Sequence, residues 1–166
     1  MKLTLSGNFL GSSTYSGEDG RVVYKVKTTL KNTTVSKILP DDVPQRDGVD
    51  GDRFAHLARI NWGLKPTIEI GGNESEAKTF LRRVGWAKDR VFTDENGREY
   101  KWDLGTRSSK LNDETKTLVA KFRQKNIGGI FGEKRPASME IFSVGESMVD
   151  LIMVTFLFVE KTRRDM

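Results

Sequence analysis

The strongest constraint on the fold is an apolar segment near the C-terminus, from Met148 to Val159, in which only Asp150 and Thr155 are polar. A helix that crosses a bilayer needs about 20 apolar residues, so this segment is too short to span a membrane. A surface helix shows one apolar stripe, whereas this segment is apolar around its whole circumference. The sequence therefore predicts a helix that is enclosed by other parts of the chain.

The residues that flank this segment also favour a helix. Ser147 followed by Asp150 fits a capping pattern, so we expect Asp150 to cap the helix rather than to act as a catalytic acid. Lys161, Arg163 and Arg164 follow, where cations favour the negative end of the helix dipole. The many β-branched and aromatic residues would also suit a strand. The length, the cap and the absence of Gly or Pro favour the helix.

Composition bounds the class of protein. A chain of 166 residues with 36% hydrophobic and 31% charged residues is typical of one globular domain, which we place at residues 1–166. The absence of cysteine excludes disulfides, thiolate metal sites and cysteine nucleophiles. The first residues have no continuous apolar core and so do not resemble a signal peptide, which predicts a cytoplasmic location. The net charge of +5 favours anionic partners.

Most of the chain consists of short alternating or β-branched runs separated by turn signals, which is typical of an all-β protein. The clearest hairpin spans residues 90–104 around Asn96-Gly97, a pair that favours a tight reversal. Apolar spacing predicts a short helix near residues 75–86. The other expected strands are 21–30, 33–39, 54–62, 67–70, 109–112, 117–123 and 137–144. We therefore predict a mostly β fold, a closed antiparallel β-barrel around a buried hydrophobic C-terminal helix.

Several motifs in the C-terminal half resemble a fungal family of unknown function that is abundant in mushroom-forming species. They are, in order, RVFTDENGREYKWDLG, LVAKFRQK, GEKRPASMEIF and MVDLIMVTFLFVEKTRRD. That family is similar to the tubby C-terminal, LURP-one and phospholipid-scramblase group, and the resemblance implies a closed β-barrel around a hydrophobic C-terminal helix. The wider group includes phosphoinositide binding, but no head-group motif matches this sequence residue by residue. Shared folds do not transfer function.

The segment from Lys121 to Arg135 is the best candidate for a binding site. It carries five cations and one acid, Glu133, around an apolar, glycine-rich tip that contains Ile130 and Phe131. Cations that flank an apolar tip suit an anionic membrane surface. The alternative is that the tip packs on the barrel and the cations are only solvated. The candidate binding residues are Lys121, Arg123, Lys125, Ile130, Phe131, Lys134 and Arg135.

A second basic cluster, which includes Arg82 and Arg83, could extend this surface if the fold brings the two together. Nucleic-acid binding would require aromatic side chains free for stacking between the cations. Strand periodicity instead places most nearby aromatic residues in the core. The sequence therefore disfavours a nucleic-acid partner.

Asp50, Asp52 and His56 have a spacing that could hold a divalent ion or act as acid and base. The spacing is not diagnostic, because the aspartates lie in a long polar loop and His56 lies on a predicted strand. Periodicity puts His56 on the same face as Ala58 and Ile60, which predicts an inward, structural histidine. We assign no metal, no catalytic residue and no cofactor.

We therefore predict a non-enzymatic, cytoplasmic binding module, with peripheral contact to a membrane. Its expected partner is an anionic phospholipid or membrane surface, or a protein. The alternative is an enzyme or small-molecule binder that uses a pocket at one end of the barrel, where loops meet the helix terminus.

Overall fold

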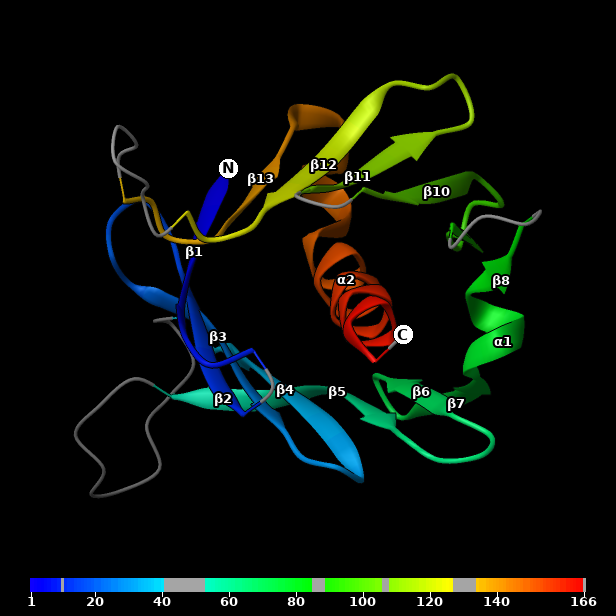
Figure 1. Cartoon of the computed structure of the whole chain (residues 1–166), viewed down its shortest axis with the longest axis horizontal. Coiled ribbons are helices and arrows are strands. Elements are labelled where there is room, and N and C mark those ends of the chain that lie inside the picture. The colour runs from blue at the N-terminus through cyan, green and yellow to red at the C-terminus, as the bar shows by residue number, and fades with distance from the viewer. Residues whose placement is uncertain (10, 41–52, 85–88, 106–107, 127–133, 166) are drawn as a thin grey trace.

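The computed structural model describes residues 1–9, 11–40, 53–84, 89–105, 108–126 and 134–165. The fold is mostly β, as predicted: one antiparallel sheet of 13 strands curves around the C-terminal helix α2 (Figure 1). The strand order is β7-β6-β5-β4-β3-β2-β1-β13-β12-β11-β10-β9-β8. The sheet therefore consists of two meanders, β1 to β7 and β8 to β13, and the pairing of β1 with β13 joins them.

The first meander contains β1 (Lys2–Gly7), β2 (Ser12–Ser16), β3 (Val22–Thr28), β4 (Asn32–Ile38), β5 (Phe54–Asn61), β6 (Thr67–Ile70) and β7 (Asn73–Glu76). The second contains β8 (Arg82–Arg83), β9 (Arg90–Thr93), β10 (Glu99–Leu104), β11 (Ser108–Asp113), β12 (Leu118–Arg123) and β13 (Ser138–Ile141). The helical elements are α1 (Ala77–Phe80), the 3₁₀ helix η1 (Ser143–Met148) and α2 (Val149–Arg164).

The prediction of a closed barrel is wrong, because the sheet has two unpaired edges. β7 and β8 are the first and last strands of the order, and no pairing joins them. The short helix α1 connects these edges and lies between them in Figure 1. Both edges are short and charged, with Glu74 and Glu76 in β7 and two arginines in β8. Short, charged edge strands disfavour further strand pairing.

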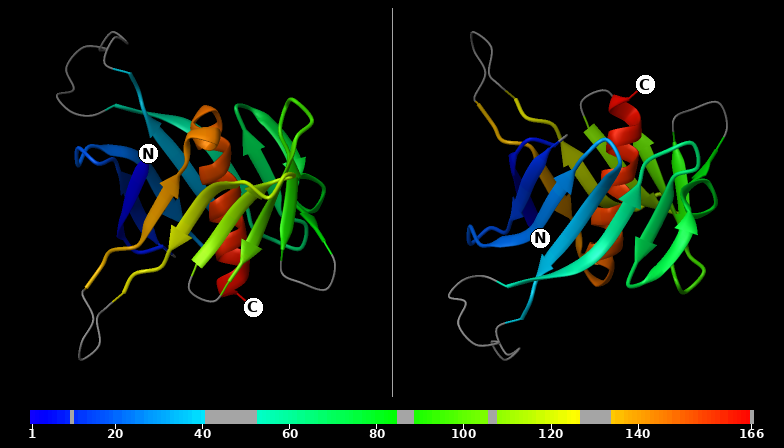
Figure 2. Two further views of the ribbon diagram at one scale, coloured as in Figure 1. Left: turned by 90° about the horizontal axis from the view of Figure 1, so that it is seen from above. Right: turned by 90° about the horizontal axis from the view of Figure 1, so that it is seen from below.

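Helix α2 packs against the concave face of this open sheet rather than inside a closed barrel (Figure 2). The side chains of residues 152–160 are buried. This burial follows from the sequence, since a helix that is apolar on every side leaves no face that is stable in water. The prediction of a C-terminal helix is confirmed, and the helix extends to Arg164.

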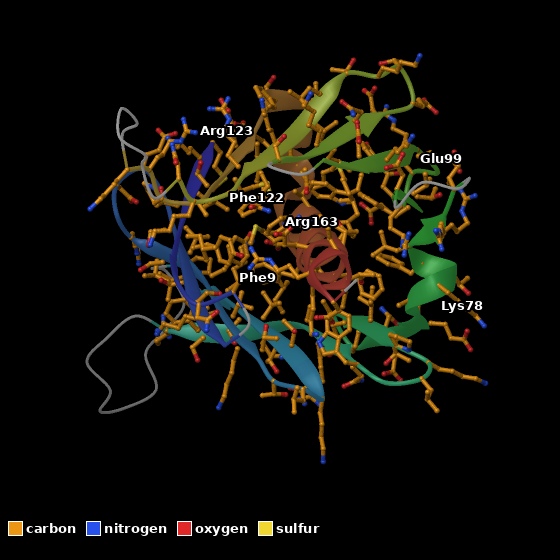
Figure 3. All side chains as sticks on the ribbon, viewed as in Figure 1. Phe9, Lys78, Glu99, Phe122, Arg123 and Arg163 are labelled. Carbon is orange, nitrogen blue, oxygen red and sulfur yellow. The ribbon has the colours of Figure 1, made fainter. Side chains whose placement is uncertain are left out.

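The middle of α2 is held by aromatic side chains from both meanders. The Phe156 ring centroid lies 4.4 Å from that of Phe122 and 6.0 Å from that of Phe9. Figure 3 shows Phe9 and Phe122 within the curve of the sheet, and Arg123 on its outer side. Thr155 is the polar exception on this part of the helix, and its hydroxyl accepts a hydrogen bond of 3.0 Å from the indole of Trp102.

The chain enters α2 through η1, where close packing requires a glycine. A Cβ atom built on Gly145 would lie 2.8 Å from Val119 Cγ1, closer than carbon atoms approach in folded proteins. Ser147 lies within η1, and the residue before the helix, Met148, makes no side-chain cap. The predicted cap formed by Ser147 and Asp150 is therefore wrong.

Most strands occur where the sequence predicts them. The hairpin around Asn96-Gly97 is confirmed as β9 and β10, and Gly97 has a φ of 81°, which suits glycine. The expected strands 109–112 and 117–123 are also present as β11 and β12, and they pair with each other as a hairpin. The helix predicted near residues 75–86 is reduced to the four residues of α1, because the chain before and after it forms edge strands. The strands β1, β2, β7 and β8 were not predicted.

Candidate functional site

Asp150, in the first turn of α2, links the helix to two strands of the sheet. Its Oδ1 atom accepts a hydrogen bond of 2.5 Å from the Tyr24 hydroxyl on β3. Its Oδ2 atom lies 2.8 Å from the ammonium group of Lys37 on β4. Alternation along β3 turns Tyr24 toward the helix, and burial together with the bond to Asp150 raises its pKa. Tyr24 therefore remains a protonated hydrogen-bond donor at neutral pH.

These groups border a hollow with a volume of about 890 Å³. We call it the α2-start pocket. The ends of β3, β4 and β6, the turn between β9 and β10, and the junction of η1 with α2 surround it. The side chains important for its chemistry are the polar Tyr24, Lys37 and Asp150 and the apolar Leu57, Ile70 and Met148. Charged side chains, among them Asp94, Arg98 and Glu146, also line it. The pocket thus combines an apolar part with a fixed polar cluster, which is typical of small-molecule sites.

The turn from Asp94 to Arg98 forms another part of the pocket wall. Asp94 Oδ1 accepts hydrogen bonds of 2.9 Å from the backbone N–H groups of Asn96 and Arg98. Burial alone would raise the pKa of Asp94, but the N–H bonds and the nearby Tyr100 hydroxyl outweigh it, so the pKa is lowered. Tyr100 stacks on Phe92 with ring centroids 5.4 Å apart. Hydrogen bonds within the turn itself therefore fix this part of the pocket wall.

The sequence-predicted basic segment is divided into two groups by the structure. Lys121 and Arg123 project from the outer face of β12, near Glu140 of β13. Arg123 Nη2 lies 3.9 Å from Glu140 Oε2. Lys125, Lys134 and Arg135 lie beyond the strand ends, near an isolated pairing of Asn126 with Arg135. These last three cations border a hollow of about 350 Å³, and no carboxylate among the described residues borders it.

Ile130 and Phe131, the predicted apolar tip, lie outside the described residues. Arg82 and Arg83 lie on β8, and β9, β10 and β11 separate them from β12. At about 4.8 Å per strand, that separation is about 19 Å. Arg82 pairs with Glu99 on the outer side of the sheet, where Figure 3 also places Glu99. The two basic clusters therefore do not form one continuous surface.

His56 faces the solvent, so the prediction of an inward histidine is wrong. The pairing of β4 with β5 shifts by one residue: Val35 lies opposite Ala58, but Ser36 lies opposite His56. This irregularity at Leu57 reverses the side on which the earlier residues of β5 project. His56 Nε2 lies 2.8 Å from Glu69 Oε2 on the outer face. Asp50 and Asp52 lie outside the described residues, and the described residues contain no group of metal ligands.

Sequence reasoning did not find Tyr24, Lys37 and Asp150 as a group. Lys37 and Tyr24 are 113 and 126 residues from Asp150 along the chain. The alternation of buried and exposed residues along β3 points Tyr24 inward, and only this signal could have indicated that Tyr24 belongs to the cluster. The polar cluster depends on how α2 crosses the sheet, and no local pattern reports that crossing.

The fold and pocket define a mostly β protein in which an open antiparallel sheet curves around one helix and leaves a pocket where the helix begins. The chain belongs to the family of unknown function DUF6593, whose sequence profile matches residues 8–165. No curated protein and no solved structure matches the chain. Among the described residues, no helix is both long enough and apolar enough to cross a membrane.

Proposed function

We propose that the protein is a binding module that takes a small molecule with an apolar body into the α2-start pocket. The observation that supports this function is the convergence of Tyr24, Lys37 and Asp150 on the wall of a hollow of about 890 Å³. The polar cluster would orient a polar group of the ligand, while Leu57, Ile70 and Met148 contact its apolar part.

The same geometry favours binding over proton transfer. Both carboxylate oxygens of Asp150 already have partners, which makes Asp150 a poor general base. The raised pKa of Tyr24 keeps its proton on the hydroxyl. Lys37 is the accessible member of the cluster, with 43% of its side chain exposed. It is therefore the group best placed to contact a ligand.

Ligand-observed NMR with a library of small apolar fragments tests this function. Ile70→Trp should fill part of the pocket and abolish fragment binding. Leu64→Trp is the matched control, because Leu64 is fully exposed away from the pocket. Lys37→Met, at a half-exposed site, should weaken polar fragments while preserving the fold. Absence of fragment binding to the wild type, or unchanged binding by a folded Ile70→Trp variant, would contradict the proposal.

A second candidate function is docking on an anionic membrane surface. It is supported by Lys125, Lys134 and Arg135, which surround a hollow that no described carboxylate borders. A cation close to an anionic membrane contributes about 1 kcal/mol, and the sequence places Ile130 and Phe131 between these cations. A protein with an acidic surface is the alternative partner.

Co-sedimentation with neutral and anionic liposomes at low and physiological ionic strength tests this second function. Replacing Lys125, Lys134 and Arg135 together by Gln should abolish salt-dependent binding. The charge-matched control replaces three exposed lysines elsewhere, Lys31, Lys65 and Lys116. Ile130→Ser with Phe131→Ser should weaken binding at both ionic strengths, because the lost contribution is apolar. Equal loss in the two triple variants would show only a general effect of net charge.

We also propose a wider kinship, a source and a cellular location for the protein. Kinship with the tubby C-terminal, LURP-one and phospholipid-scramblase group, and a fungal source, are supported by the order of four motifs between residues 90 and 165. A cytoplasmic location with peripheral membrane contact is supported by the composition and the basic cluster. Fluorescence microscopy of the tagged protein in living cells tests the location.

A further inference from the structure

At the end of α2, two arginines share one buried carboxylate. Glu160 is 0% exposed, and Arg163 donates to both of its oxygens, from Nε at 2.9 Å and from Nη2 at 2.6 Å. Arg164 donates to it only from Nε, at 2.9 Å. One negative charge therefore meets two positive charges, which leaves a net charge of +1 at this end of the helix.

The guanidinium of Arg164 is fixed in place, but its outer edge is available. Its Nε bond to Glu160 and its stacking on Phe9, with Cζ 4.5 Å from the ring centroid, hold the group in one orientation. Within the described part of the chain, its two Nη groups make no hydrogen bond, whereas Nη2 of Arg163 donates to Glu160. A guanidinium edge with two parallel N–H groups matches the two oxygens of a carboxylate.

Arg164 borders a hollow of about 420 Å³, which we call the α2-end hollow. Lys125 supplies a second cation to its wall, and no carboxylate among the described residues borders it. Leu5, Phe9, Pro136 and Ala137 form the apolar part of the wall. The α2-end hollow therefore offers a positive end and an apolar surface.

We propose that the α2-end hollow binds an amphipathic carboxylate, an apolar chain that ends in one carboxylate group. The carboxylate pairs with the free edge of Arg164 and with Lys125. The chain lies against Leu5, Phe9, Pro136 and Ala137. A single charge on the ligand matches the net charge of +1 that Glu160 and its two arginines leave. This site lies at the opposite end of α2 from the α2-start pocket and does not depend on it.

Isothermal titration calorimetry with decanoate as the probe tests the proposal, with acetate and the matching alcohol, decanol, as comparisons. Decanoate should bind at least about tenfold more tightly than either, because acetate lacks the chain and decanol lacks the charge. Amide shifts in NMR spectra of the wild type should report binding at Leu5 and Ala137 and not at Lys37 or Met148. Equal affinity for decanol, or shifts only near Lys37 and Met148, would overturn the proposal.

Variants separate Arg164, which donates one hydrogen bond to Glu160, from Arg163, which donates two. Arg164→Gln should weaken decanoate binding by about tenfold or more, and Arg164→Lys should recover only part of it because an ammonium group lacks the two-donor edge. Arg163→Gln is the matched control, since Arg163 binds the same Glu160 but does not border the hollow. Thermal unfolding of each variant confirms that it is folded. Equal loss in the Arg163 and Arg164 variants would contradict a site at Arg164.

Discussion

The two ends of helix α2 each carry a carboxylate with two partners, but the partners come from different places. Asp150, at the start, binds Tyr24 and Lys37 from the sheet, and 35% of its side chain is exposed. Glu160, near the end, is fully buried and binds Arg163 and Arg164 of its own helix. The start is therefore tied to distant strands, whereas the carboxylate near the end is neutralised by residues of the helix itself.

This difference separates two structural roles for a charged group. The bonds of Asp150 fix where the helix meets the sheet, and they form only when the tertiary structure is complete. The bonds of Glu160 can form within the last turns of the helix itself, where pairs three and four residues apart are neighbours. Their role is to make the burial of a carboxylate possible and to leave one cation facing outward.

The substitution with the largest expected effect places a charge in the middle of α2, between its two ends. Val154 is 0% exposed, so Val154→Asp would bury an unpaired carboxylate and should prevent folding. Circular dichroism with thermal denaturation should show no cooperative transition. Leu64→Asp, at a fully exposed position, is the control and should unfold like the wild type. A Val154→Asp variant with near-normal stability would show that α2 is not enclosed as described.

Matched amide substitutions compare the two carboxylates directly. Glu160→Gln should lower the free energy of unfolding by about 3 kcal/mol, because it leaves two arginines near a buried neutral group. Asp150→Asn should lower it by about 1 kcal/mol, because Asp150 and its partner Lys37 are partly exposed and the amide oxygen can still accept the hydrogen bond from the buried Tyr24. Urea denaturation measures both. The reverse order would mean that the link to the sheet matters more than local pairing.

Two buried tyrosines, Tyr24 near the start of α2 and Tyr15 near its end, allow a further comparison of the two ends. The hydroxyl of Tyr24 bonds to Asp150, whereas that of Tyr15 has no hydrogen-bond partner among the described residues. Burial, with a smaller contribution from the nearby Glu160, raises the pKa of Tyr15. Tyr24→Phe should therefore cost about 1 kcal/mol of stability. Tyr15→Phe should be neutral or slightly stabilising, because it removes an unsatisfied buried group. Equal losses in urea denaturation would point to an unrecognised partner of Tyr15.

The smallest effect concerns the pH dependence of the α2-start pocket. The pKa of Asp94 is lowered in the folded protein, so its ionised form stabilises the fold above the pKa of the unfolded chain, about 3.9. This contribution is lost as the pH falls through the folded-state pKa. Asp94→Asn should therefore be slightly less stable than the wild type at pH 7, with a smaller difference at about pH 3. Urea denaturation at both values measures it, and a constant difference would contradict this role.

The sequence predicts local structure well and long-range geometry poorly. The all-round apolarity of α2 and the turn at Asn96-Gly97 are encoded within a few residues, and both predictions are confirmed. Closure of the sheet depends on whether β7 and β8 pair, and neither strand carries that information in its own residues. A one-residue irregularity at Leu57 was enough to move His56 to the other face.

The candidate sites show the same limit. The sequence predicts that Lys161, Arg163 and Arg164 lie at the negative end of the helix, and this prediction is confirmed, because all three lie in the last turn of α2. Arg163 and Arg164 bind the same carboxylate in different ways. This difference depends on where Glu160 is buried, and the pattern of charges in the sequence does not reveal that position. The cluster around Asp150 required three elements to meet.

The joining of the two meanders has a consequence for synthesis on the ribosome. Leu3 of β1 lies opposite Met139 of β13. The strand β1 therefore cannot form this pairing until β13 has been synthesised. The seven strands of the first meander can pair with their neighbours as they emerge, but their apolar inner face stays bare until α2 has also left the exit tunnel. Exposed apolar surface in such intermediates promotes aggregation. The nascent chain should therefore be prone to aggregation until α2 has been synthesised and can pack on the sheet.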